Sequence, residues 1–225
     1  MPPAVVLFDI DGTLIRRAGP HHREALVSAV RNVTGVETSL DGIPTGGMLD
    51  RDILRAMMSA AGAEANLIEG SMARIVAEAQ DVYSGLTPDL RRTLCPGVRV
   101  CLRRLMSAGI PLGLVTGNLT GIAWKKMEHS GLLRYFRFGA FAEQAGTRAG
   151  LVEIALRQAR RRGWLRRETP VSLVGDHPND IRAAKLNDIR SVAVATGIVP
   201  RSALAAHSPD LLLSDLRSME VGMFL

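Results

Sequence analysis

The chain has 225 residues, of which 47% are hydrophobic and 22% are charged. This composition excludes a largely disordered chain, and a chain of this length can bury a core without disulfides or a structural metal. The two cysteines, Cys95 and Cys101, have no His or Cys partner at metal-ligand spacing, so we predict that both are reduced thiols.

The formal net charge of +6 raises the question of nucleic-acid binding. Much of the positive charge lies near the end of one predicted helix, in Arg157, Arg160, Arg161, Arg162, Arg166 and Arg167. We interpret this run as a solvated helix end, where cations suit the negative end of the helix dipole, or as a source of attraction for anionic substrates. Trp164 lies within the run, but one aromatic residue is not a stacking platform, so the pattern does not favour nucleic acid as a partner.

The first apolar run, residues 4–8, is too short for a signal peptide or a membrane span. No later apolar run reaches the roughly 18 residues that a membrane-spanning helix needs. We therefore expect no membrane partner and a cytoplasmic location.

Apolar or β-rich runs predict strands at residues 5–8, 110–115, 171–174 and 192–194, with a weaker one at 211–213. Between the later runs, apolar residues recur at helical spacing over residues 98–105 and 151–158. Buried strands that alternate with helices predict a parallel sheet covered on both faces. The expected fold class is therefore α/β, with a Rossmann-like doubly wound parallel sheet.

Residues 16–94 break this alternation. They contain no convincing strand, and apolar residues recur at helical spacing in three stretches. We predict that this segment is a helical insert between the first strand and the rest of the sheet.

The most informative motif follows the first predicted strand, where residues 9–13 read Asp-Ile-Asp-Gly-Thr. Two carboxylates that emerge together from a buried strand need compensation, and a hard cation such as Mg²⁺ supplies it. A calcium loop is the alternative, but the further oxygen ligands and the downstream Glu of such a loop are missing.

Two more motifs follow predicted strands. Thr116, Gly117 and Asn118 offer a hydroxyl and backbone N–H groups at a helix start, which suits a phosphate, although such a turn is also common without one. Asp176 and Asp180 supply two further carboxylates, and helix capping explains only the second of them. Because ligands bind beyond the carboxyl ends of parallel strands, we expect all three motifs to converge.

These motifs resemble, in order and spacing, those of the haloacid dehalogenase-like superfamily of phosphatases, in particular its phosphoglycolate phosphatase-like branch. The resemblance spans most of the chain and rests on residues 9–13, on Thr116, and on Asp176 with Asp180. It implies a Rossmann-like catalytic core at residues 1–15 and 95–225, and a helical cap domain at residues 16–94.

The resemblance also implies catalytic roles. Asp9 would be the nucleophile, Asp11 the general acid/base, and Thr116 would bind the phosphoryl group with Gly117 and Asn118. The superfamily's dehalogenases lack the second aspartate, so Asp11 argues for phosphoryl transfer.

Mg²⁺ is the cofactor that the resemblance implies. Its ligands would be the Asp9 carboxylate, the main-chain oxygen of Asp11 and Asp176, with Asp180 in support.

One departure from the family pattern concerns the cation that faces the phosphate. The family usually has a lysine there, whereas this chain offers Arg148, just before a helix expected to start near Leu151. Lys125 and Lys126 lie too far upstream to match that position. Arginine keeps the charge and can bind phosphate oxygens with two N–H groups, so we expect Arg148 to serve, both in catalysis and in phosphate binding.

Substrate choice is expected to depend on the cap. There, Gly46 and Gly47 form a flexible pair, and Asp50 is a possible N-cap of the next helix, so this loop is our candidate for specificity. His21 and His22 could face the cleft, but we interpret them as the surface start of the first cap helix.

The expected activity is Mg²⁺-dependent hydrolysis of a small phosphomonoester, of the phosphoglycolate or sugar phosphate class, by a monomer or weak homodimer. Two alternatives stay open: a phosphosugar mutase resembling β-phosphoglucomutase, and a binding module that senses phosphate without catalysis.

Overall fold

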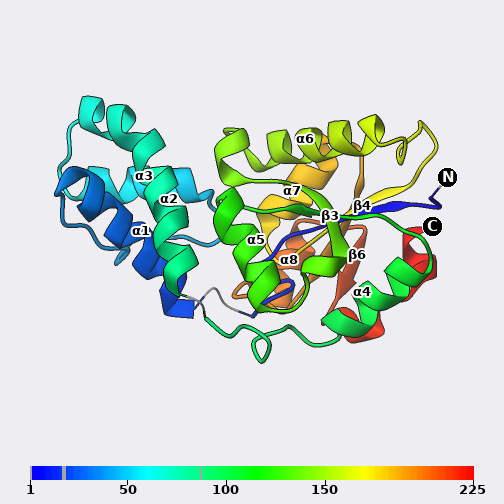
Figure 1. Ribbon diagram of the computed structural model, residues 1–225. Coiled ribbons are helices and arrows are strands. Elements are labelled where there is room, and N and C mark those ends of the chain that lie inside the picture. The colour runs from blue at the N-terminus through cyan, green and yellow to red at the C-terminus, as the bar shows by residue number, and fades with distance from the viewer. Residues whose placement is uncertain (1, 17–18, 87) are drawn as a thin grey trace.

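A computed structural model describes residues 2–16, 19–86 and 88–225. In this part of the chain a six-stranded sheet has the strand order β3-β2-β1-β4-β5-β6, and all neighbouring strands are parallel. The strands are β1 (Val5–Phe8), β2 (Leu112–Val115), β3 (Phe136–Ala140), β4 (Val171–Gly175), β5 (Arg190–Val194) and β6 (Leu211–Leu213). The predicted α/β class with a doubly wound parallel sheet is confirmed (Figure 1).

Strand β1 is buried on both faces. Because side chains alternate across a strand, Val5 and Leu7 join one apolar cluster while Val6 and Phe8 join another. The first cluster includes residues from α6 (Arg148–Arg161) and α7 (Pro178–Leu186), and the second includes residues from α4 (Val98–Ser107). Burial on both faces explains why β1 is continuously apolar.

The insert contains α1 (Gly19–Thr34), α2 (Asp50–Ala60) and α3 (Ala65–Leu86). These helices group beside the sheet, where α3 packs against α1 and against α5 (Thr120–His129) (Figure 1). Their apolar faces belong to the same cluster as Leu119 and Ile122, at the start of α5, and as the β1 residues Val5 and Leu7. The remaining helix, α8 (Arg201–Ala206), lies between β5 and β6 in the chain. The proposed domain limits at 15/16 and 94/95 stay a prediction.

Three details differ from the sequence prediction. Strand β3 is missing from it, because Arg137 and Gly139 interrupt the apolar run of this short strand. Strand β2 begins at Leu112 rather than at residue 110, and β5 begins at Arg190, two residues before the predicted start.

Both cysteines are free thiols, as predicted, and both are buried. The six arginines near the end of α6 are all exposed, which agrees with a solvated helix end. Within the described residues, no helix is both long and apolar enough to cross a membrane.

The core can be tested with two leucines that lie on helices but differ in burial. Leu102 on α4 is fully buried, whereas Leu186 at the end of α7 is 75% exposed. We expect Leu102→Ala to lower the free energy of unfolding by about 2–5 kcal/mol, because it leaves a cavity. Leu186→Ala should change it by about 0.5 kcal/mol or less, measured by urea denaturation. Equal losses in the two variants would contradict this assignment of the core.

Candidate active site

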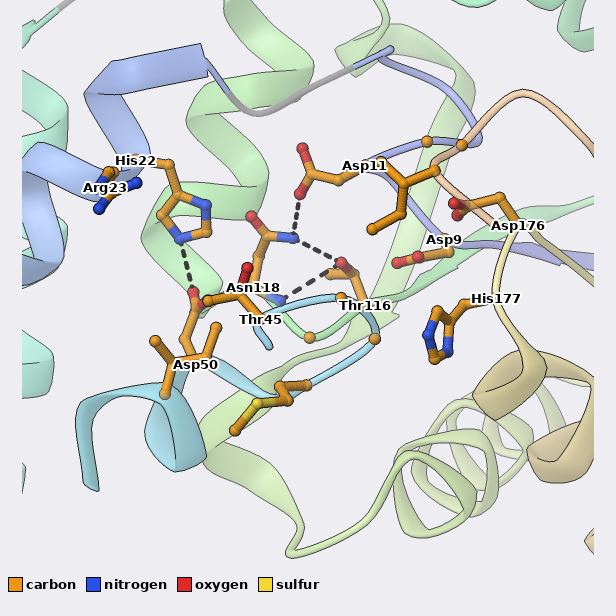
Figure 2. Close-up of a pocket in the computed structure, with 18 of the residues that line it drawn as sticks. Asp9, Asp11, His22, Arg23, Thr45, Asp50, Thr116, Asn118, Asp176 and His177 are labelled. Atoms are coloured by element: carbon orange, nitrogen blue, oxygen red, sulfur yellow. Dashed lines mark hydrogen bonds and ion pairs between the residues drawn. The ribbon is translucent and has the colours of Figure 1, made fainter. Parts of the chain in front are cut away.

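The three motifs meet at one edge of the sheet because their strands are neighbours. Strand β1 lies between β2 and β4, and the chain order reverses there, which is where ligands bind in open α/β sheets. Asp9 follows β1, Thr116 follows β2 and Asp176 follows β4, so the three residues reach the same cleft (Figure 2).

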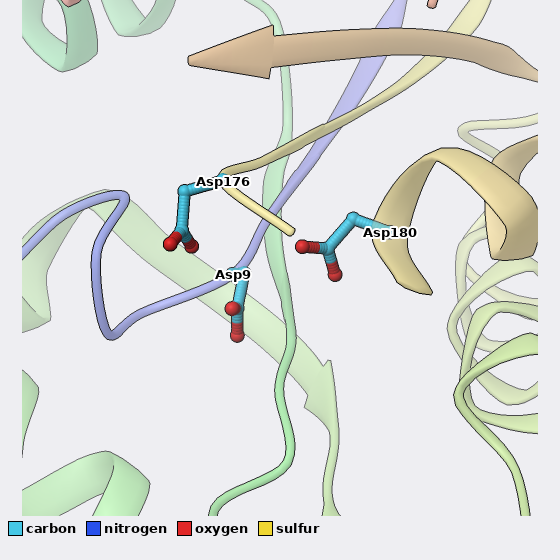
Figure 3. A group of neighbouring side chains, drawn as sticks. All are labelled: Asp9, Asp176 and Asp180. Carbon is cyan, nitrogen blue, oxygen red and sulfur yellow. The ribbon is translucent and has the colours of Figure 1, made fainter. Parts of the chain in front are cut away.

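Three buried carboxylates form the acidic part of the site. Asp9, Asp176 and Asp180 each place an oxygen within 4.8 Å of the others (Figure 3). Burial, together with the Asp9 and Asp180 carboxylates, raises the pKa of Asp176 to about 8. Burial and Asp9 raise the pKa of Asp180 to about 7, although Arg148 opposes this shift. A cation would relieve this repulsion, and an all-oxygen donor set fits Mg²⁺.

Local structure fixes each of these carboxylates. Asp180 lies in the first turn of α7, where its Oδ2 accepts a hydrogen bond from the backbone N–H of His177 at 3.1 Å. Asp176 accepts one from the Thr13 hydroxyl at 3.2 Å. Gly12 is required beside it, because its φ is +82° and a Cβ there would lie 2.1 Å from a carboxylate oxygen of Asp176.

Arg148 is the cation nearest to this cluster. It is the first residue of α6, which therefore begins three residues earlier than predicted, after the N-cap Thr147. Its Nη1 lies 3.2 Å from Asp9 Oδ1 and 2.8 Å from Asp180 Oδ1. Burial disfavours the charged guanidinium, but the Asp180 and Asp9 carboxylates outweigh it and raise the pKa of Arg148. The arginine thus offsets part of the negative charge and stays fully protonated.

The predicted phosphate-binding turn lies directly under the cap. Thr116 is buried, and its Oγ1 accepts a hydrogen bond from Asn118 Nδ2 at 2.8 Å. A Cβ at Gly117 would lie 2.2 Å from the carbonyl oxygen of Met48, so the cap loop passes close above this turn. The same Gly117 accepts a hydrogen bond from the backbone N–H of Asp50 at 2.8 Å.

Lys126 is a site residue that the sequence prediction missed. It is fully buried on α5, and its Nζ lies 2.6 Å from Asp11 Oδ2 and 2.5 Å from Asn118 Oδ1. Burial raises the pKa of Asp11, but Lys126 and His22 outweigh it, so the net shift is downward. A signal was present in the sequence: Lys126 lies one turn after Ile122, on the apolar face of the helix, where an unpaired lysine would be costly.

His22 and Asp50 connect the cap to this lysine. His22 Nδ1 lies 3.2 Å from Lys126 Nζ, and His22 Nε2 lies 3.0 Å from Asp50 Oδ2 (Figure 2). The interpretation of His22 as a surface residue is therefore wrong; His21 does not line the cavity in the described structure. Asp50 is not the N-cap of its own helix: its Oδ2 accepts the backbone N–H of Leu119 at 2.9 Å, at the start of α5.

The Gly46 and Gly47 loop closes one side of the cleft. Asn179 donates a hydrogen bond to the Gly47 carbonyl at 2.7 Å, and a Cβ on Gly47 would lie 2.3 Å from the His177 ring. The cavity between core and cap has a volume of about 790 Å³ and is lined by residues of both. Asp9, Asp11, Arg148 and Asp176 all line it.

The charge balance of the acidic cluster can be tested in metal-free protein. At pH 9 with EDTA, we expect Arg148→Met to lower the free energy of unfolding by about 3–5 kcal/mol, because it leaves buried carboxylates without their cation. At pH 5 the loss should be smaller, since raised pKa values let Asp176 and Asp180 take up protons.

Arg157→Met is the matched control. Arg157 is exposed and lies 3.8 Å from Glu153 in an exposed pair, so its removal should change the free energy of unfolding by about 0.5 kcal/mol or less. The same loss in both variants, or no dependence on pH, would contradict the assignment of Arg148 as the cluster's counter-charge.

Comparisons with known proteins agree with this geometry. Residues 3–188 match the family model of the haloacid dehalogenase-like hydrolases. The phosphoglycolate phosphatase of Salmonella typhimurium is 26% identical over 228 residues, which cover 95% of this chain and 90% of that protein. The phosphoglycolate phosphatase of Synechococcus elongatus is 29% identical over 211 residues, which cover 92% and 91%.

Solved structures share the fold. A β-phosphoglucomutase from Clostridium difficile superposes with a TM-score of 0.73 at 19% identity, covering 99% of this chain and 95% of that one. A predicted phosphoglycolate phosphatase from Haemophilus somnus has a TM-score of 0.69 at 20% identity, covering 96% of each chain. The family model matches most of this chain. The chain therefore belongs to the haloacid dehalogenase-like hydrolases and is a phosphoric monoester hydrolase.

Proposed function

We propose that this enzyme hydrolyses a small phosphomonoester, of the phosphoglycolate or sugar phosphate class, through an aspartyl-phosphate on Asp9. The observation that carries the proposal is the convergence of Asp9, Arg148 and Asp176 at the end of the central strands, beside the predicted phosphate-binding turn. Similarity to phosphoglycolate phosphatases over nine-tenths of their length supports the substrate class. A binding module without catalysis is set aside, since the chain is a hydrolase.

Asp9 is the proposed nucleophile because, of the three clustered carboxylates Asp9, Asp176 and Asp180, it is the one that both lines the cavity and pairs with Arg148. Its carboxylate lines the cavity and lies 3.2 Å from Arg148 Nη1, which can also neutralise a phosphoryl group. Attack by the Asp9 oxygen on phosphorus forms the aspartyl-phosphate and releases the alcohol; water then cleaves this intermediate and releases inorganic phosphate. Two modest barriers thus replace one that is very high in water.

The proposed metal is Mg²⁺, bound by the Asp9 carboxylate, the Asp11 main-chain oxygen and Asp176, with Asp180 in support. When bound, it would lower the repulsion between an anionic carboxylate and an anionic phosphate. Its positive charge would also oppose the rise in the pKa values of Asp176 and Asp180, which burial causes first and repulsion by neighbouring carboxylates second.

Asp11 is the proposed proton carrier. In the first step it would donate a proton to the leaving oxygen, and in the second its carboxylate would take a proton from the attacking water. The ion pair with Lys126 favours the carboxylate, which is the form that the second step needs. For the first step Asp11 must carry a proton when the substrate is bound.

The cavity limits the substrate to a small molecule. A volume of about 790 Å³, shared between core and cap, suits a ligand of metabolite size. The cap side offers Arg16 and Arg23 together with apolar side chains, so the part of the substrate that leaves can be both apolar and anionic.

The central test is a panel of phosphomonoesters, including phosphoglycolate and hexose phosphates, assayed with Mg²⁺ and with EDTA. We expect phosphate release only with the metal, and Asp9→Asn should lower kcat by about 10³-fold or more while the protein stays folded. Acid-quenched wild-type enzyme should carry labelled phosphate that Asp9→Asn lacks.

The matched control is Asp81→Asn, the same change at an exposed carboxylate on α3. It should behave as wild type. Substantial turnover by purified Asp9→Asn would refute the nucleophile assignment, and isomerised sugar phosphate in place of free phosphate would identify a mutase.

The proposed specificity of the cap loop can be tested with two glycines. Gly47 and Gly62 both have positive φ, at +67° and +78°, so alanine strains the backbone at either position. A Cβ at Gly47 would overlap the His177 ring, whereas nothing lies within 4 Å of one at Gly62. We expect Gly47→Ala to change kcat/KM unequally across the panel by about tenfold, and Gly62→Ala to lower only stability. Uniform kinetics for Gly47→Ala would reject a specificity role for this loop.

A further inference from the structure

Lys126 is a buried cation to which the proposed reaction assigns no contact with the substrate. Its side chain is 0% exposed, and desolvating an ammonium group costs several kcal/mol. A buried ion pair is weak evidence for a gain in stability, because an apolar side chain of similar volume is often as good or better. The position of Lys126 therefore suggests a functional reason for its charge.

Three polar groups surround the ammonium group. Its Nζ lies 2.6 Å from Asp11 Oδ2, 2.5 Å from Asn118 Oδ1 and 3.2 Å from His22 Nδ1. An ammonium has three donors, so these partners can occupy all of them. Lys126 does not line the cavity in the described part of the chain, in contrast to all three of its partners. It is therefore placed to act through its neighbours rather than on a substrate.

The contacts converge on one oxygen of Asp11. Oδ2 accepts from Lys126 Nζ and also from Asn118 Nδ2 at 2.8 Å, while Asn118 is itself held by Lys126 and by Thr116. The three side chains of Asp11, Asn118 and Lys126 thus form a closed hydrogen-bonded triangle, and rotation of the carboxyl group would break two bonds at once.

The other oxygen of Asp11 is left free. Among the described residues, Oδ1 is buried and has no hydrogen-bond partner, although Asp11 lines the cavity. Leaving a buried carboxylate oxygen unpaired is costly unless another group meets it. In Figure 2 the hydrogen-bonded oxygen of Asp11 points toward Asn118 and the second oxygen points away from it. A leaving oxygen or a water that enters beside Oδ1 would be a partner that suits proton transfer.

We propose that Lys126 is a positioning residue for proton transfer: with Asn118 it anchors Asp11 Oδ2, so that Oδ1 faces first the leaving oxygen and then the attacking water. This inference rests on the proposed role of Asp11. Misplacing a reacting group by about 1 Å can cost about 10²-fold in rate, so the anchor matters even though it touches no substrate.

The test compares two substrates that differ in their need for a proton. A phosphate ester of an alcohol, with phosphoglycolate as the first probe, requires proton donation to its leaving oxygen, whereas 2,4-dinitrophenyl phosphate releases a stable anion. The ratio kcat/KM reports on the steps up to phosphoryl transfer. We expect Lys126→Met to lower kcat/KM about 10–100-fold for the alcohol ester and less than about threefold for the aryl ester. Asp11→Asn should give the same selective pattern in a stronger form.

Lys125→Met is the matched control, since Lys125 is the adjacent residue and pairs with Glu128 on the exposed side of α5. It should leave kcat/KM unchanged for both substrates. Equal losses on both substrates in Lys126→Met would show a structural role and overturn the proposal, as would no loss on either. If Lys126→Met does not fold, Lys126→Gln is judged by the same criteria.

The proposed function is tested separately. Wild-type enzyme without Mg²⁺-dependent turnover of either ester, or an Asp9→Asn variant that retains it, would refute the phosphatase mechanism. Without wild-type turnover no selective loss in Lys126→Met can be measured, whereas an active Asp9→Asn variant would refute the nucleophile assignment whatever Lys126→Met shows, so the two failures are distinguishable.

Discussion

The repulsion among Asp9, Asp176 and Asp180 is the constraint on which the rest of the site depends. One oxygen of each carboxylate lies within 4.8 Å of the others, and all three residues are almost excluded from water. The protein itself supplies one counter-charge, Arg148, which contacts two of them directly. Burial and the neighbouring carboxylates still raise the pKa values of Asp176 and Asp180, so Arg148 offsets only part of the unfavourable environment. The sheet thus holds, at the end of its central strands, a charge imbalance that a divalent cation would remove.

The fourth aspartate has the opposite environment, although it is only two residues from Asp9. Asp11 faces α5, where Lys126 lies 2.6 Å away and lowers its pKa. Pairs of acids whose surroundings shift their pKa values in opposite directions are typical of sites that divide chemical roles. Gly12, which follows Asp11, has a φ of +82° and packs against Asp176.

The sequence predicts the sheet and its acidic residues for a clear physical reason. Parallel strands end at one edge, so motifs that follow apolar strands must converge, and Asp9, Asp176 and Asp180 do. Arg148 also lies where it was expected, although α6 begins at that residue itself. Strand β3 could not be predicted in the same way, because its own short sequence is not continuously apolar. Its extended conformation depends on pairing with β2.

The polar contacts between cap and core could not be predicted from strand order or from local residue spacing. Lys126 and His22 are 104 residues apart, and Asp50 and Leu119 are 69 apart, so no local spacing relates them. The sequence relates Lys126 only to the position that Arg148 occupies. In the structure Lys126 contacts Asp11, which is 115 residues away in the chain. Pairings of this kind follow from how α1 and α2 dock against α5, which depends on side-chain packing and not on periodicity.

The start of α5 shows how closely cap and phosphate site are joined. The first N–H groups of a helix lack partners within it and attract anions. Here those of Leu119 and Thr120 are taken by the Asp50 and Glu143 carboxylates, and that of Gly121 by Gln80. Asp50 and Gln80 come from cap helices α2 and α3. A bound phosphate therefore cannot use these three N–H groups while the cap is docked. The groups left for a phosphate are then Arg148 and the predicted phosphate-binding turn before the helix, at Thr116, Gly117 and Asn118. If the cap opens, the hydrogen bonds that Asp50 and Gln80 make at the start of α5 must be exchanged.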